Sequence, residues 1–248
     1  MKKTILLLLS AVILTAFVPN EFKTNQKRYK RVRQAYLEKE KIVDSLLTTN
    51  SITKSKLQIY FRVFKTEEII ELWAKNSTDT KYKKIKDYKI CANSGVIGPK
   101  REQGDEQVPE GFYYINRFNP ASSFYLSLGL NYPNISDRIL GTKGLLGGDI
   151  FIHGDCCTIG CMPLTDDVIK EFYVFCVEAK DNGQTKIPVT IYPTKLTDSK
   201  FNSLKAKYKD DSDRINLWTD LHIAYKKFET DKTVPKVTFL KSGRHTIK

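Results

Sequence analysis

Most of the potentially reactive side chains lie in one segment, Ile152-His153-Gly154-Asp155-Cys156-Cys157-Thr158-Ile159-Gly160-Cys161-Met162-Pro163-Leu164. It contains three of the five cysteines and one of the three histidines in 248 residues. A cysteine attacks as its thiolate, and an imidazole is the usual base for the thiol proton. The glycines let the backbone approach a substrate closely, and an amide near Cys161 could stabilise an oxyanion. The segment therefore predicts nucleophilic catalysis by a cysteine with His153 as the base.

The flanking sequence predicts a sheet with helices around it. Residues 149–154 form an apolar strand that runs into a glycine turn, and Thr165 is a good N-cap for an amphipathic helix over 166–179. Other stretches rich in β-formers predict strands at 57–64, 82–91, 112–118, 124–130 and 187–192. Helical spacing predicts helices at 25–48, 67–75, 196–208 and 213–230, and the chain ends with a short apolar run at 236–240.

The quoted segment resembles the catalytic domain of the L,D-transpeptidase family (YkuD domain), whose pattern is His-Gly, a spacer and Ser/Thr-x-Gly-Cys. His153-Gly154 and Thr158-Ile159-Gly160-Cys161 match this pattern. Upstream, Val108-Pro109-Glu110-Gly111-Phe112-Tyr113 resembles the family's Thr-Pro-Glu-Gly segment. Three further segments are similar to the YafK-like branch of the family: Asn119-Pro120, Phe124-Tyr125-Leu126-Ser127, and Asn131-Tyr132-Pro133-Asn134 with Asp137-Arg138. The resemblance covers about residues 56 to 193.

The resemblance implies a mainly β (α+β) fold, a sandwich or barrel of the L,D-transpeptidase type with flanking helices. It also implies that Cys161 attacks a carbonyl after a diaminopimelate-type residue in a peptidoglycan stem peptide and forms a thioester. An amine then resolves the thioester in transpeptidation, or water does so in hydrolysis. His153 would be the base, oriented by a backbone carbonyl. Thr158, Gly160 and Gly154 would supply the motif hydroxyl and backbone contacts to the substrate.

Two departures from the family pattern bear on the site. The spacer between the histidine and Thr158 is short, as in the YafK-like branch, and Pro163 stands where typical members have an arginine. Arg138 is a candidate to recognise a substrate carboxylate in its place, although a structural salt bridge is the more ordinary role for such a residue. Tyr125 is a second candidate for substrate binding, as a wall of the groove.

The remaining cysteines admit several roles. Cys156 or Cys157 could be a redox partner of Cys161, could pair with Cys91 or Cys176, or could be a small apolar filler. Cys156, Cys157, Cys161 and His153 together are suitable ligand types for zinc. Adjacent cysteines are awkward ligands for one tetrahedral centre, and no second cysteine pair has the spacing of a zinc finger. We therefore expect neither a metal nor another cofactor.

The N-terminus predicts export to the periplasm or cell envelope. Two lysines precede an apolar run from Ile5 to Val18, which is typical of a signal peptide and short for a membrane span. We predict a signal peptide or membrane anchor at 1–18, a charged helical segment at 19–55, the catalytic domain at 56–195 and a helical extension at 196–248. The segment 19–55 could be a spacer or could pack on the domain.

The net charge of +13 narrows the expected partners. An exported basic protein meets anionic wall polymer or lipid headgroups, and solubility alone also accounts for such a charge. Nucleic acid is a third class of partner, which the export signal disfavours. We expect peptidoglycan stem peptides as partners, with a wall-attached protein and peripheral or N-terminal membrane association as further options. The leading function is a transpeptidase; the alternatives are an amidase or hydrolase of the same fold and a non-catalytic wall-binding module.

Overall fold

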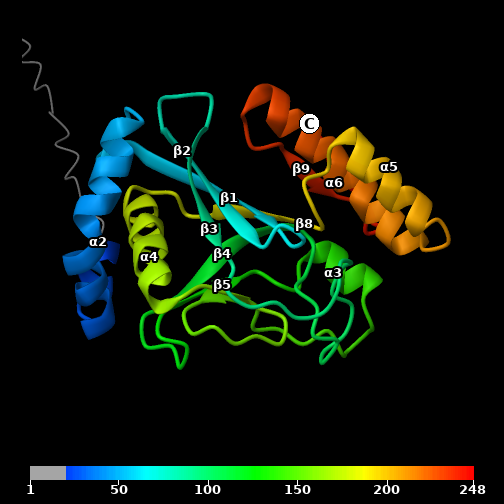
Figure 1. Ribbon diagram of the computed structural model, residues 1–248, viewed down its shortest axis with the longest axis horizontal. Coiled ribbons are helices and arrows are strands. Elements are labelled where there is room, and N and C mark those ends of the chain that lie inside the picture. Colours follow the sequence, from blue (N-terminus) through cyan, green and yellow to red (C-terminus); the bar gives the residue numbers. More distant parts are fainter. Residues whose placement is uncertain (1–20) are drawn as a thin grey trace, which may run out of the picture.

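The computed structural model describes residues 21–248 (Figure 1). The helices are α1 (Phe22–Gln26), α2 (Lys30–Thr49), the 3-10 turn η1 (Lys54–Lys56), α3 (Ile135–Leu140), α4 (Asp166–Asp181), α5 (Asp198–Lys207) and α6 (Ser212–Asp231). The strands are β1 (Leu57–Phe64), β2 (Ile69–Asn76), β3 (Lys83–Lys89), β4 (Gly111–Asn119), β5 (Ser127–Leu130), β6 (Phe151–His153), β7 (Met162–Pro163), β8 (Ile187–Tyr192), β9 (Val237–Phe239) and β10 (His245–Ile247).

Eight strands form one sheet in the order β3-β2-β1-β8-β4-β5-β6-β7. The pairs β1–β8 and β6–β7 are parallel, and the other neighbours are antiparallel. Just after the edge strand β3, the amide of Cys91 donates to the carbonyl of Pro163 in the opposite edge strand β7, at 3.0 Å. The two edges therefore meet, and the sheet curls on itself. This mixed architecture confirms the α+β expectation.

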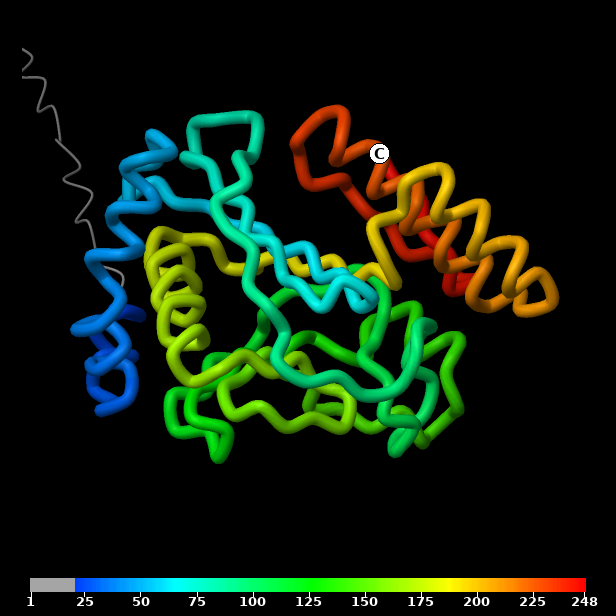
Figure 2. Tube along the Cα trace, viewed as in Figure 1, coloured from blue at the N-terminus to red at the C-terminus, as the bar shows by residue number. Residues whose placement is uncertain are grey.

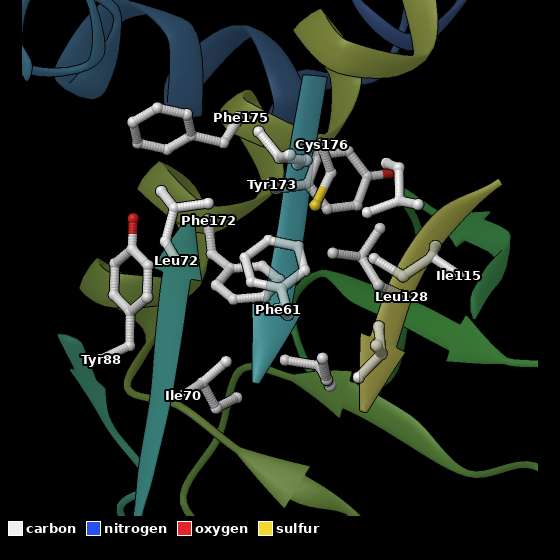
Figure 3. Close-up of a cluster of buried hydrophobic side chains, with 14 of the residues drawn as sticks. Phe61, Ile70, Leu72, Tyr88, Ile115, Leu128, Phe172, Tyr173, Phe175 and Cys176 are labelled. Carbon is white, nitrogen blue, oxygen red and sulfur yellow. The ribbon is translucent and has the colours of Figure 1, made fainter. Parts of the chain in front are cut away.

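The main core lies between the sheet and α4. Alternate residues of β1, namely Ile59, Phe61 and Val63, are fully buried on this side. The rings of Phe61 and of Phe172 in α4 lie together (Figure 3) and stack with centroids 4.2 Å apart. Burying each such side chain stabilises the fold by about 1.5–3 kcal/mol. The predicted N-cap of α4 is confirmed, because the Thr165 side chain accepts a hydrogen bond from the amide of Val168.

The opposite face of β1 is also buried, here under α6. Phe64 packs with Trp218 of α6 in one cluster, and Tyr60 packs with Phe228 in another. Between them Arg62 is 1% exposed, and its guanidinium pairs with Glu229 at 2.7 Å. A strand covered on both faces explains why the apolar run at 57–64 shows little polar alternation.

The N-terminal helix packs on the domain. Helix α2 lies against α4 (Figure 2). Between the two helices, the hydroxyl of Tyr36 donates to Glu178 at 2.8 Å and Lys39 donates to Asp167 at 2.7 Å. The predicted signal or anchor at 1–18 lies outside the described residues. Within residues 21–248, no helix is long and apolar enough to cross a membrane.

Several predicted elements need correction. The helix expected at 67–75 is wrong: this stretch is β2, paired on both sides with β1 and β3, and its buried residues alternate between two faces. The strand expected at 124–130 begins only at Ser127, because Tyr125 has a φ of 65°. The helix expected at 25–48 is divided into α1 and α2. Helix α3, strand β7 and the hairpin β9–β10 were not predicted.

Candidate active site

Adjacent strands bring His153 and Cys161 to one edge of the sheet. His153 is the last residue of β6, and Cys161 directly precedes β7. The register pairs Ile152 with Met162, which sets Phe151 opposite Cys161. The amide of Phe151 donates to the sulfur of Cys161 at 3.4 Å. The intervening residues 154–160 therefore form a short loop between two parallel strands.

The imidazole of His153 is held in one orientation. Its Nδ1 lies 2.5 Å from the carbonyl oxygen of Gly154. A carbonyl only accepts hydrogen bonds, so Nδ1 carries the proton and Nε2 keeps a free lone pair. The ring is 2% exposed and packs against Phe124 with centroids 4.7 Å apart. Burial lowers the pKa of His153, which keeps the imidazole neutral at neutral pH.

The environment of Cys161 favours its protonated form. Burial raises the pKa of the thiol, and the amide of Phe151 and the ammonium of Lys100 only partly offset this. The thiol donates to the carbonyl of Asp149 at 3.6 Å. Across residues 21–248, no hydrogen bond links His153 to Cys161. The resting pair is therefore a neutral thiol and a neutral imidazole, and the thiol needs a base to become a nucleophile.

The hydroxyl of Thr158 organises the turn before Cys161. It accepts from the amides of Cys161 at 2.8 Å and Gly160 at 3.2 Å, and it donates to the carbonyl of Cys161 at 2.9 Å. Gly160 has a φ of 126°, a conformation that side chains rarely adopt, and a Cβ there would lie 3.1 Å from the carbonyl of Gln107. The amide of Cys161, the nearest one that could stabilise an oxyanion, is thus engaged by Thr158 in this structure.

A disulfide anchors the same loop. Cys156 pairs with Cys91, one of the two structural partners considered from the sequence, while Cys157 is exposed and Cys176 is buried, both as free thiols. Cys91 also donates to Pro163. The residue in the family's arginine position therefore helps to close the sheet. Within the described part of the chain, no group of three or more His, Cys, Asp or Glu is arranged to hold a metal ion.

Cys161 opens into a pocket of about 370 Å³. Its walls come from two loops, around 100–106 and 147–150, which are joined by a hydrogen bond from the amide of Gln103 to the carbonyl of Leu145 at 2.7 Å. Lys100 lines this pocket, is 5% exposed, and pairs with Asp105. Sequence reasoning missed Lys100, because it lies in a loop with no motif. A buried lysine near a cysteine cannot be recognised until the fold joins the two loops.

The two residues proposed for substrate binding lie elsewhere. Arg138 lines a separate pocket of about 470 Å³ that shares no residue with the cysteine pocket. Tyr125 is half-buried and packs against the main core and α2, where the guanidinium of Arg31 lies 5.3 Å from its ring centroid. Gly154 has a close-packed position, because a Cβ there would lie 2.7 Å from Oδ1 of Asp166.

Comparison with known proteins identifies the family. Residues 58–191 match the family model of YkuD, the L,D-transpeptidase catalytic domain. The chain belongs to the L,D-transpeptidase family. It is 36% identical over 191 residues to the protein named "Putative L,D-transpeptidase YafK" of Escherichia coli (strain K12), a match that covers 76% of this chain and 73% of that protein. This relative agrees with the YafK-like branch indicated by the motifs.

Solved structures with lower identity also align with this L,D-transpeptidase family member. The helical cell shape determining protein Pgp2 from Campylobacter jejuni is 20% identical and has a TM-score of 0.42, with 80% of each chain covered. Bd1075 from Bdellovibrio bacteriovorus is 18% identical with a TM-score of 0.40, and the match covers 75% of this chain and 78% of that one.

Proposed function

We propose that the protein is an exported, cysteine-dependent peptidoglycan L,D-transpeptidase that acts through a thioester on Cys161. The observation that carries the proposal is the placement of Cys161 and His153. The thiol opens into a pocket, and on the neighbouring strand the imidazole is locked by Gly154 with its Nε2 free. The family membership supplies the substrate class, because L,D-transpeptidases act on peptidoglycan.

Acylation follows from the protonation states of the resting site. Nε2 of His153 takes the thiol proton, and Sγ of Cys161 forms a bond to the stem-peptide carbonyl carbon. The carbon–nitrogen bond to the terminal residue then breaks. His153 returns its proton to the leaving amine, and the stem peptide remains as a thioester on Cys161. This sequence needs a neutral histidine, which the lowered pKa of His153 provides.

Deacylation reverses the same steps with a new nucleophile. An acceptor amine gives its proton to His153 and bonds to the thioester carbon, and Sγ leaves and recovers the proton. Lys100 contributes a positive charge to the pocket. It is suited to hold a stem-peptide carboxylate during both steps and so to supply the charge that an arginine provides in typical members.

Hydrolysis is the second candidate, and the composition of the pocket favours it. Three glycines, Gly104, Gly147 and Gly148, form much of the wall around Cys161. Side chains that would exclude water are therefore few on this side, and water can reach the thioester. In this case the protein detaches stem-linked groups and does not crosslink them.

Location outside the cytoplasm is consistent with two features. The family substrate is a wall polymer, and the Cys91–Cys156 disulfide is of a kind that persists in oxidising compartments. Both support an exported protein, as proposed from the apolar N-terminal run.

Incubation with purified muropeptides and mass spectrometry of the products tests the proposal. We expect crosslinked or exchanged stems for a transpeptidase and shortened stems for a hydrolase, in each case lost with Cys161→Ala and with His153→Ala. The control is Cys157→Ala, which removes the neighbouring exposed thiol and should leave the products unchanged. Products that persist in Cys161→Ala would contradict the proposal.

A further inference from the structure

A second pocket, larger than the one at Cys161, lies beside α3. It has a volume of about 470 Å³ and is bounded by β4, the segment before α3, the start of β8 and the hairpin strand β9. A smaller pocket of about 180 Å³ continues from it, because both are lined by Tyr114, Asn131 and Phe239. We call the two together the Arg138 groove. The groove shares no residue with the cysteine pocket.

The charge of the groove has one sign. Arg138 and Lys186 line it and are exposed, and its lining contains no aspartate or glutamate. Across residues 21–248, neither cation takes part in an ion pair. The ammonium of Lys186 lies 4.9 Å from the ring centroid of Tyr114, which holds it at the mouth of the groove. Two cations without counter-charges in a concave surface attract an anion, and a guanidinium is suited to bind a carboxylate with two hydrogen bonds.

The rest of the lining is suited to the uncharged, partly apolar portion of a ligand. The rings of Tyr114 and Phe239 are half-buried, and the smaller pocket continues along Pro188, Val234 and Pro235. Asn131 uses its side-chain oxygen to accept from the amide of Tyr114 at 2.7 Å, so its amino group remains as a donor for a ligand carbonyl. The complementary ligand is an extended chain with amides, small apolar groups and at least one carboxylate.

The groove is also connected to the wall of the cysteine pocket. Tyr132 lines the groove, and its hydroxyl donates to the carbonyl of Leu146 at 3.2 Å. Leu146 directly precedes Gly147 and Gly148, which line the cysteine pocket. A ligand in the groove therefore lies against a segment that leads to the reacting thiol.

We infer that the Arg138 groove binds a carboxylate-bearing stem peptide of the wall polymer, other than the one that reacts at Cys161. This inference rests on the proposed function. Stem peptides combine carboxylates with amides and small apolar groups, as the groove requires. A polymeric substrate that occupies both sites gains an effective concentration at the second site from binding at the first. The groove would thus favour intact wall over short soluble fragments.

Sedimentation with purified sacculi tests the binding without catalysis. In the Cys161→Ala background, we expect Arg138→Ala/Lys186→Ala to weaken binding to sacculi by about tenfold, from the loss of two charge-assisted contacts. Lys205→Ala/Lys209→Ala, which removes two exposed lysines elsewhere, should bind as before. Sacculi whose carboxylates have been converted to amides should bind the parent protein as weakly as untreated sacculi bind the double variant.

Unchanged binding by the double variant would overturn the inference, and so would unchanged binding to amidated sacculi. Chitin is a neutral glycan. If binding to chitin depended on the two cations as strongly as binding to sacculi does, the groove would be assigned to the sugar strand and the inference would again be overturned. Both substituted side chains are exposed, so thermal unfolding should show that the double variant is folded.

A kinetic comparison separates the groove from the reacting site. We expect the double variant to lower the ratio of kcat/KM on sacculi to kcat/KM on a soluble tetrapeptide by about tenfold. Equal losses on both substrates would place Arg138 at the reacting peptide and contradict the inference. If no Cys161-dependent product forms while sedimentation still depends on carboxylates and on the two cations, the proposed reaction fails and the binding groove remains.

Discussion

Lys100 and Cys161 share one pocket, and the ammonium of Lys100 opposes the burial that raises the pKa of the Cys161 thiol. Asp105 and the carbonyl of Glu102 hold the ammonium in place. We propose that Lys100 supplies, from a different loop, the positive charge of the arginine that typical family members carry two residues after the cysteine. Pro163, which occupies the usual arginine position, serves in closing the sheet.

Removing the charge of Lys100 should make Cys161 less reactive. For Lys100→Ala, we expect the midpoint of Cys161 alkylation by iodoacetamide to move to higher pH by about one unit. Activity on a soluble tetrapeptide should fall by about tenfold. Lys209→Ala, an exposed position, is the control. Thermal unfolding and the milder variant Lys100→Gln would show whether the loss comes from a misfolded loop. An unchanged alkylation profile in both variants would show that Lys100 does not influence the pKa of Cys161.

The pH profile should report a neutral base and a neutral thiol. Burial lowers the pKa of His153, so kcat/KM should rise with pH through a midpoint below about 6.5, the ordinary histidine value. Burial raises the pKa of Cys161, so alkylation of the free enzyme should have its midpoint above about 8.5, the ordinary cysteine value. A preformed thiolate–imidazolium pair predicts the opposite, namely rapid alkylation well below pH 7.

Arg31 of α2 should support His153, the proposed base, from a distance. Its guanidinium donates to the carbonyls of Ser122 and Tyr125, on either side of the Phe124 ring that packs on His153. We expect Arg31→Ala to lower kcat on muropeptides by roughly tenfold or more through misplacement of the imidazole, with little change in the alkylation midpoint.

Arg33→Ala is the control for that effect, since Arg33 is exposed and its guanidinium donates to the carbonyls of Lys27 and Arg28, in the turn between α1 and α2. Equal rates for the Arg31 and Arg33 variants would show that α2 does not influence the site.

The Cys91–Cys156 disulfide should stabilise both the fold and the loop that carries Thr158. It joins two cysteines that are 65 residues apart in the sequence. Removing it should lower the free energy of unfolding by about 2–4 kcal/mol. Cys91→Ser, Cys156→Ser and the double variant should therefore show the same loss in chemical denaturation. Cys157→Ser should leave stability unchanged, because this thiol is exposed and unpaired. Additive losses in the double variant would argue against the pair.

Helices and strands could be predicted from the sequence where their local residue pattern agrees with their place in the fold. Thr165 marks the start of α4, and the apolar stretch at 187–192 is β8 as predicted. The pattern failed at β2, because 67–75 was predicted to be a helix, whereas Leu72 and Trp73 lie on opposite faces of a strand. Pairing with β1 and β3 on both sides determines that strand, and such pairing is not encoded locally.

The residues of the candidate site also differ in whether a local motif or long-range contacts place them. A short motif holds Cys161, Thr158 and His153 within one loop and its two strands, so the motif alone indicated them. Lys100 depends on contacts between loops far apart in the chain. Arg138 was a candidate to recognise a substrate carboxylate, and the structure places it in a pocket other than that of Cys161. Pairing of Cys91 with Cys156 was one of several options, and only the meeting of β3 and β7 selects it.

Peptide mapping of the acylated enzyme tests the central claim most directly. The protein is mixed briefly with a tetrapeptide muropeptide, quenched in acid, digested and examined by mass spectrometry. The account predicts an acyl adduct on Cys161 that hydroxylamine removes, that persists in Cys157→Ala and that is absent in Cys161→Ala. Product formation with the adduct on Cys157, or with equal turnover by Cys161→Ala, would contradict it.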